Sequence, residues 1–439
     1  MPVNLYVAQT LQNRNVHRAV LENGMTVLTV ENPAADIIAA RIFIRAGSRY
    51  EVAAQTGISH LLSAVITKGT ANFSSQQIAE QVESVGASLG TDAASDYCLL
   101  SLKTVSADFV EMLKLAAEIL RSPIFPAPEV ELERRLTLQG IRSMQEQPFA
   151  IGQNQLRQAM YQQHPYAFSG LGTEATVSQL TQADLQTYHQ TYFRPDNLVI
   201  SIAGRILPEE AIALVDQVFG DWHPPQQDGQ ILPLPSPELP PVTSDPRPVI
   251  TVQETQQAIL MLGYLAPAVK NADYAALKLL STYLSNGLSS RLFVELREKQ
   301  GLAYEVSGFY PTRLDTSHFV VYMGTAPINT AVAIEGLRRE VDRLSQTLLS
   351  ADELQASKNK LLGQYALGKQ TNAQIAQTFG WYETLGLGIE FDQTFQQAIA
   401  NVTAEAAQDA ACRYLGEPYL SFVGPAIAVD ALSVITSPQ

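Results

Sequence analysis

Residues 56–70 read Thr56-Gly57-Ile58-Ser59-His60-Leu61-Leu62-Ser63-Ala64-Val65-Ile66-Thr67-Lys68-Gly69-Thr70. The pattern predicts a helix that carries one imidazole, His60, followed within about one turn by Ser63 and Ala64. A zinc-dependent hydrolase needs a second imidazole and a carboxylate at such spacing. Ser63 cannot act as a general base near neutral pH, and Ala64 has no ligand atom. His60 alone is therefore interpreted as a packed or hydrogen-bonded helix residue.

The segments that flank this helix carry a resemblance to a known family. They are Leu21-Glu22-Asn23-Gly24, the apolar run 37–44, Ala46-Gly47-Ser48-Arg49 before the helix and Lys68-Gly69-Thr70 at its end. In this arrangement the chain resembles the M16 family of zinc peptidases, the pitrilysin and mitochondrial-processing-peptidase-like enzymes. The resemblance implies an H-x-x-E-H zinc motif here and a third ligand, a glutamate, on a later helix.

By this resemblance the zinc motif is degenerate at His60, Ser63, Ala64 and Gly140, where Gly140 occupies the place of the third ligand. Glu131 and Glu133 precede Gly140 by nine and seven residues. Along a helix this separation is roughly 10 Å or more, so neither glutamate could reach a metal at the third-ligand position with a bond of about 2 Å. We therefore expect this chain to bind no metal.

A second motif lies in the other half of the chain, at residues 289–304. It is similar to the M16 segment that presents an arginine and a tyrosine seven residues apart, which here are Arg297 and Tyr304. A phenol can donate to a developing oxyanion, and a guanidinium can fork onto a carbonyl or carboxylate, without a metal on the same chain. The alternative is structural: Arg297 would be one charge on a solvated helix face, and Tyr304 an aromatic at the start of a strand.

The resemblance implies a non-zinc subunit of a heterodimeric M16B peptidase that cleaves unfolded peptides. Arg297 and Tyr304 would face a cleft whose zinc and base belong to the partner chain. Two alternatives stay open. One is a non-enzymatic relative similar to the zinc-less core subunits of respiratory complexes, and the other is an enzyme with an unrecognised site. The remaining histidines, His17, His164, His189, His223 and His318, show no ligand spacing with one another.

Composition narrows the class of protein. The chain has 439 residues, of which 46% are hydrophobic and 16% charged, which favours large folded cores over disorder. The net charge of −14 disfavours nucleic acid as a partner. It would suit cationic peptides, although most acidic proteins have no such ligand.

We find no apolar run that could span a bilayer and no signal peptide, so we expect a cytoplasmic protein. Cys98 and Cys412 are expected to be reduced thiols packed as small hydrophobes.

The proline-rich stretch 223–248 divides the chain into two similar halves. Prolines remove hydrogen-bond donors and fix the backbone, so we expect an extended connector without strand or helix. Glu131 and Glu353 are 222 residues apart, as are Leu180 and Val402, which indicates an internal duplication. We predict an N-terminal domain at 1–222 and a C-terminal domain at 249–439.

Each half is expected to fold as an α+β sandwich, a sheet with helices packed on it, as the resemblance also implies. Thr181 and Thr403 are predicted helix caps, each with a carboxylate in the next turn. The predicted strands are 25–30, 37–44, 99–104, 198–203, 249–252, 258–262, 317–323 and 419–423, and the predicted helices include 106–121, 274–284 and 330–344. Residues 86–97 predict an edge strand that either pairs with an extended peptide or is purely structural; Gly90-Thr91 replaces the Asn-Ala of active relatives.

Overall fold

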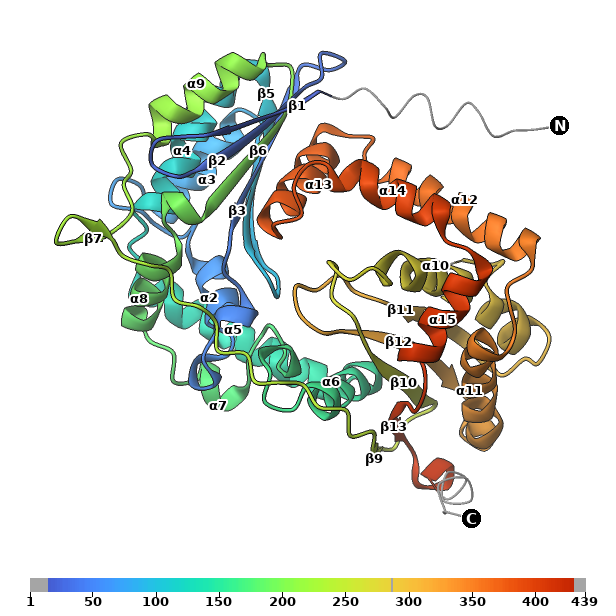
Figure 1. Ribbon diagram of the computed structural model, residues 1–439. Helices are drawn as coiled ribbons and strands as arrows, with labels where there is room; N and C mark the ends of the chain where they lie inside the picture. The colour runs from blue at the N-terminus through green and yellow to red at the C-terminus, as the bar shows by residue number, and fades with distance from the viewer. Residues whose placement is uncertain (1–14, 286, 430–439) are drawn as a thin grey trace. The chain divides into compact units, whose positions relative to one another are not determined.

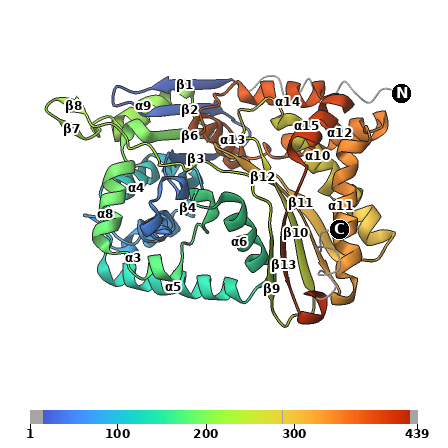
Figure 2. The ribbon, with the colours of Figure 1, turned by 60° about the horizontal axis from the view of Figure 1, so that its bottom comes forward.

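A computed structural model describes residues 15–285 and 287–429 (Figure 1). The first sheet has the strand order β1-β2-β6-β3-β5-β4, and the β2–β6 pair is parallel while the other pairs are antiparallel. Figure 2 shows β1, β2, β6 and β3 side by side in this order. The strands are β1 (Val16–Val20), β2 (Thr26–Glu31), β3 (Ile37–Ile44), β4 (Ser88–Ala93), β5 (Cys98–Val105) and β6 (Leu198–Gly204).

The second sheet has the order β11-β12-β10-β13-β9, and its β13–β9 pair is parallel. Its strands are β9 (Pro248–Val252), β10 (Ala258–Ala266), β11 (Ala303–Phe309), β12 (Ser317–Thr325) and β13 (Tyr419–Gly424). The two orders correspond strand by strand, β4-β5-β3-β6-β2 with β11-β12-β10-β13-β9, and the parallel pair recurs at the same place. The topology confirms the predicted duplication and the α+β class.

Helices cover both sheets. The α-helices are α2 (Ile58–Val65), α3 (Ser75–Ser84), α4 (Phe109–Arg121), α5 (Ala127–Gln145), α6 (Pro148–Tyr161), α7 (Glu174–Val177), α8 (Gln182–Tyr192), α9 (Pro208–Phe219), α10 (Tyr274–Ser285), α11 (Thr330–Gln346), α12 (Ala351–Leu367), α13 (Asn372–Thr384), α14 (Phe391–Asn401) and α15 (Ala404–Tyr414). Shorter turns are η1 (Ser48–Tyr50), η2 (Ala53–Gln55), η3 (Ser106–Asp108), η4 (Pro165–Ala167), η5 (Pro195–Asn197), the π-helix η6 (Phe293–Glu298) and η7 (Pro327–Asn329). Thr181 and Thr403 cap α8 and α15 as predicted, by accepting from the backbone N–H of Asp184 and Ala406.

The two compact units exchange a helix. One unit consists of residues 15–140, 169–238 and 365–392, and the other of 141–168, 239–364 and 393–429. In the first unit, α13 packs on β3 and β6, although α13 comes from the C-terminal half of the chain. In the second unit, α6 from the N-terminal half packs on β10 and β13. The boundaries predicted at 222 and 248 thus describe halves of the sequence, whereas each compact unit combines segments of both halves.

The connector and the cysteines depart in detail from expectation. Residues 232–247 have no regular secondary structure, but β7 (Gln226–Gln227) and β8 (Gln230–Ile231) pair within the stretch expected to lack strands. Asp228 and Gly229 both have positive φ, at 52° and 77°, which is the requirement of a tight two-residue hairpin turn. Both cysteines are free thiols, and Cys98 is buried as expected, but Cys412 is exposed on α15, where its Sγ lies 3.6 Å from the Ser345 carbonyl oxygen.

Gly380 lets α13 lie directly on the first sheet. A Cβ at this position would stand 2.4 Å from Phe43 Cε2 and 2.8 Å from Ser201 Cβ, and Phe43 is fully buried. We expect Gly380→Ala to lower the free energy of unfolding by about 2–3 kcal/mol, because the helix must move off a packed ring. Gly363→Ala on α12 is the matched control, since nothing lies within 4 Å of its Cβ; it is expected to stabilise by about 0.5–1 kcal/mol. Urea unfolding of both variants checks this, and equal midpoints would contradict the close approach.

Candidate functional site

The helix that carries His60 is held at its start by a buried carboxylate. Gly57 adopts φ 95° just before α2, and the backbone N–H groups of Gly57 and Ser59 donate to Glu51 at 2.9 and 3.0 Å. Burial raises the pKa of Glu51, while these hydrogen bonds oppose the rise. Glu51 is 8% exposed and acts as a side-chain cap for the start of α2.

The three predicted motif positions on α2 have different surroundings. His60 is half-buried, and burial lowers its pKa against the opposing charges of Asp92 and Glu133. Ser63 is buried beside Cys98, whose pKa burial raises to about 12, and the Ser63 carbonyl accepts a hydrogen bond from Thr91 Oγ1 at 2.6 Å. Ala64 is only half-buried.

Gly140 lies on α5 with room around it. A Cβ at Gly140 would meet only Leu171 Cδ1, at 3.9 Å. Glu133, two turns earlier, forms an ion pair with Lys68 at 3.0 Å. Zinc needs at least three protein donors, and these positions offer one imidazole, so the residues present do not fit a zinc ion. Among the residues that the structure describes, no group of three or more His, Cys, Asp or Glu side chains is arranged to hold a metal.

Arg297 and Tyr304 are brought together in the second unit. The Arg297 guanidinium lies 5.0 Å from the centre of the Tyr304 ring and 4.6 Å from that of Phe293. Arg297 forms no ion pair with the described residues, whereas Arg291, Glu295 and Lys299 form a charged ladder along the same helix. Arg297 therefore differs from these neighbours in having no ion pair among the described residues, and the choice between a functional and a structural role stays a prediction.

The backbone around this pair is irregular in a way that displays Tyr304. Arg297 belongs to the π-helix η6, and the pairing of β11 with β12 shifts register between Ala303 and Glu305, so Tyr304 is the extra residue of a β-bulge. Its side chain is 80% exposed. Both π-helical turns and bulges are common at functional sites, where they redirect a side chain. Tyr304 is therefore displayed at the surface, next to the half-buried Arg297.

Comparison with known proteins identifies the family. The model described as "Insulinase (Peptidase family M16)" matches residues 26–174, and that described as "Peptidase M16 inactive domain" matches residues 179–361. The chain belongs to the M16 peptidase family.

Relatives of this M16 chain extend over most of its length. It is 27% identical to a zinc protease of Bacillus subtilis, over 82% of this chain and 86% of the relative. It is also 27% identical to a zinc protease of Streptomyces coelicolor, over 93% and 90% of the two chains. A crystal structure titled as a peptidase M16 inactive domain, from Pseudomonas fluorescens, is similar with a TM-score of 0.85 and 25% identity, covering 94% of this chain and 98% of that one. A protease structure from Helicobacter pylori shares the fold with a TM-score of 0.87.

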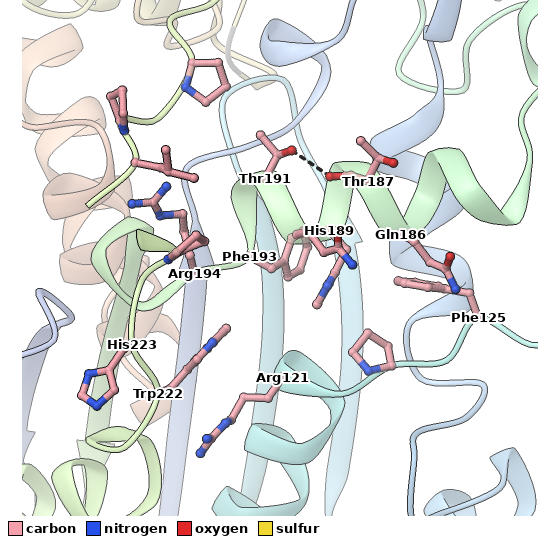
Figure 3. Close-up of a pocket in the computed structure, with 16 residues that line it drawn as sticks. Arg121, Phe125, Gln186, Thr187, His189, Thr191, Phe193, Arg194, Trp222 and His223 are labelled. Atoms are coloured by element: carbon pink, nitrogen blue, oxygen red, sulfur yellow. Dashed lines mark hydrogen bonds between the residues drawn. The ribbon is translucent and has the colours of Figure 1, made fainter. Parts of the chain in front are cut away.

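The M16 chain also has a pocket that sequence reasoning did not find. A cleft of about 780 Å³ in the first unit lies between α8, the end of α4 and the start of the connector (Figure 3). Its two guanidiniums each donate two hydrogen bonds to an aspartate, Arg121 end-on to Asp221 and Arg194 side-on to Asp196. The only signal in the sequence was the cluster of prolines. The pocket is lined by Arg121, Pro123, Phe125, Gln186, Thr187, His189, Gln190, Thr191, Phe193, Arg194, Trp222, His223, Pro225, Leu232, Pro233 and Pro235.

His189 at this pocket makes stability sensitive to acid. Its Nε2 lies 2.9 Å from the Leu120 carbonyl, and burial lowers its pKa to about 4. Because the folded pKa is below the unfolded value of about 6.5, the contribution is complete above pH 6.5 and is lost as the pH falls toward 4. We expect wild type to lose about 2–3 kcal/mol over this window through His189, and His189→Gln to lose correspondingly less. Urea unfolding at pH 7 and pH 4 measures the difference; exposed His17→Gln is the control, and parallel slopes for all three proteins would contradict the prediction.

The M16 chain has a β4 edge strand, as predicted, with alternating exposed and half-buried residues. Its use as a peptide-pairing edge stays a prediction. Within residues 15–285 and 287–429, no helix combines the length and apolar character that a membrane crossing requires.

Proposed function

We propose that this chain is the zinc-less subunit of a two-chain M16 peptidase that cleaves unfolded peptides, and that it supplies Arg297 and Tyr304 to the partner's site. The observation that carries the proposal is the displayed Arg297–Tyr304 pair, held by a π-helix and a bulge. A guanidinium without a carboxylate partner and an exposed phenol suit contact with a peptide carbonyl.

The chemistry expected of the pair is hydrogen bonding and charge. Tyr304 would donate its O–H to the carbonyl oxygen as negative charge develops there. Arg297 would fork onto a neighbouring carbonyl or a carboxylate of the same peptide. The two aromatic rings that contact the Arg297 guanidinium, Phe293 and Tyr304, limit its freedom, so less entropy is lost when the peptide binds.

Metal and base are assigned to the partner because this chain cannot supply them. Ser63, Ala64 and Gly140 replace a base and two ligands, and Ser63 is packed against buried Cys98. Residues 179–361 match a family described as an inactive domain, which supports a non-catalytic role for at least that part of the chain.

The test is reconstitution. This chain and an M16 chain with an intact zinc motif from the same genome are purified separately and together, and hydrolysis of an unfolded fluorogenic peptide is measured. Activity is expected only from the mixture, together with a complex on size-exclusion chromatography. Hydrolysis by this chain alone, or by the other chain at full rate without it, would overturn the proposal.

A second candidate is a structural subunit without a part in catalysis. It is favoured by Thr91 on the edge strand β4, where active relatives carry Asn-Ala. The Thr91 hydroxyl donates to the Ser63 carbonyl, so this side chain joins β4 to α2. This candidate predicts that a complex forms but that Arg297 and Tyr304 can be replaced without loss of activity.

A further inference from the structure

Two arginines in the second unit lie on segments that contact each other, and neither is paired with a carboxylate among the described residues. Arg157 is on α6, and Arg313 is on the connection between β11 and β12. Arg157 hydrogen-bonds to the side-chain oxygen of Asn154, and the Arg313 guanidinium lies 5.1 Å from the centre of the Tyr166 ring. Both partners are neutral, so neither of them balances the positive charge of its guanidinium.

Neither arginine forms an ion pair within the described part of the chain, and both are half-buried. The Nε atom of each is fully buried and has no hydrogen-bond partner there. Burial and the neighbouring Arg313 charge lower the pKa of Arg157 to about 10. By contrast, Arg194 and Arg291 are each bound to a carboxylate within 2.7 Å. An uncompensated buried guanidinium costs several kcal/mol, so two in one place call for an anion.

The connection that carries Arg313 is rigidly held. The Arg313 carbonyl accepts from the Val269 N–H at 3.0 Å, and the neighbouring Thr312 hydroxyl bonds to Tyr274 at 2.6 Å. Tyr161, one turn after Arg157 on α6, bonds to the Thr316 carbonyl at 3.1 Å and to His318 Nδ1 at 2.8 Å. These contacts tie α6 to the connection, so the two guanidiniums are positioned before any ligand arrives.

We propose that Arg157 and Arg313 form an anion site that binds a carboxylate of a peptide, either its chain terminus or an acidic side chain. Two guanidiniums can give a carboxylate paired, charge-assisted hydrogen bonds. The two arginines give the site a charge of +2 in a chain whose net charge is −14. The acidic part of a peptide would therefore be attracted to this site and repelled by most of the remaining surface. The peptide as ligand rests on the proposed function; the anion site itself does not.

The test is binding of labelled peptides to the full chain by fluorescence polarisation. Three versions of one unfolded peptide are compared: acid-free with a C-terminal amide, acid-free with a free carboxylate, and amidated with one internal glutamate. Arg157→Gln and Arg313→Gln are each expected to weaken the carboxylate-bearing peptides about 10- to 100-fold and to leave the amidated, acid-free peptide unchanged. Which carboxylate-bearing version is affected identifies the source of the carboxylate. Exposed Arg205→Gln is the matched control.

A second measurement separates this proposal from the proposed function. Inorganic phosphate is expected to raise the melting temperature of wild type and of Arg205→Gln, at constant ionic strength, but not that of Arg157→Gln or Arg313→Gln. If wild type binds no peptide but shows this phosphate effect, the anion site stands and its peptide ligand is wrong. If all variants respond equally to phosphate and to every peptide, the site is wrong even where peptide binding holds. Loss of folding is not expected, because each substitution removes a buried unpaired charge.

Discussion

Tyr304→Phe in the reconstituted two-chain enzyme is expected to lower kcat about 100- to 1000-fold, since this is the usual effect of losing one donor to an oxyanion. Only the hydroxyl is removed, and the side chain is already 80% exposed, so folding should be unaffected. Arg297→Ala is expected to reduce kcat/KM by a similar factor, with a larger share in KM because the guanidinium also holds the peptide in the ground state. Steady-state hydrolysis of the fluorogenic peptide measures both.

Controls for this prediction come from the same unit. Tyr414→Phe and Arg413→Ala, both on α15, change the same residue types on a different element. Complex formation is followed by size exclusion in each case. An intact complex in which Tyr304→Phe and Arg297→Ala hydrolyse peptide as fast as wild type would establish the structural-subunit alternative instead.

Ala64→His combined with Gly140→Glu is expected to give a chain that binds one zinc ion where wild type binds none. Gly140 has space for a side chain, because a Cβ there would meet only Leu171 Cδ1. Leu171 also lies near the start of α2, since a Cβ on Gly57 would stand 2.6 Å from the Leu171 carbonyl oxygen. The resemblance places side chains at positions 64 and 140 near His60, and Lys68, just after α2, already forms an ion pair with Glu133 of α5 at 3.0 Å. Burial lowers the pKa of His60, which favours the neutral imidazole that a metal requires.

The same double variant is expected to remain inactive as a peptidase, because position 63 still has no base. The cavity at Ser63 and Cys98 is only about 10 Å³, too small for a glutamate side chain, so Ser63→Glu should destabilise rather than restore activity. Metal content after equilibrium dialysis, with Ala64→His alone as control, measures binding. Equal zinc in the double variant and in wild type would show that Gly140 does not lie where the resemblance places it.

Much of the fold was predictable from local pattern. The strands at 37–44 and 198–203 are apolar runs that match β3 and β6, and the threonine caps of α8 and α15 follow from short-range chemistry. The proximity of Arg297 and Tyr304 was expected from the resemblance and is local, within one helix, turn and strand.

The exchange of α6 and α13 could not be predicted from the same patterns. The apolar face of a helix specifies burial but not which sheet will cover it, and the two sheets offer nearly equivalent faces. The Arg157–Arg313 pair was missed for the same reason, since its two members are brought together only because α6 packs on the second sheet. The β7–β8 hairpin was overlooked because the prolines around it outweighed the Asp228-Gly229 turn signal.

The exchanged helices also have a consequence for synthesis. The first sheet is complete in sequence at Gly204, but α13, which covers β3 and β6, ends only at Thr384, 180 residues later. At about 5–20 residues per second, the ribosome needs roughly 10–40 s to deliver that helix. During this interval the nascent chain presents the apolar side chains of Leu28, Phe43 and Val199 to its surroundings. The first unit therefore cannot complete its core until the chain has been translated as far as α13, and the uncovered apolar face of its sheet is open to aggregation in that interval.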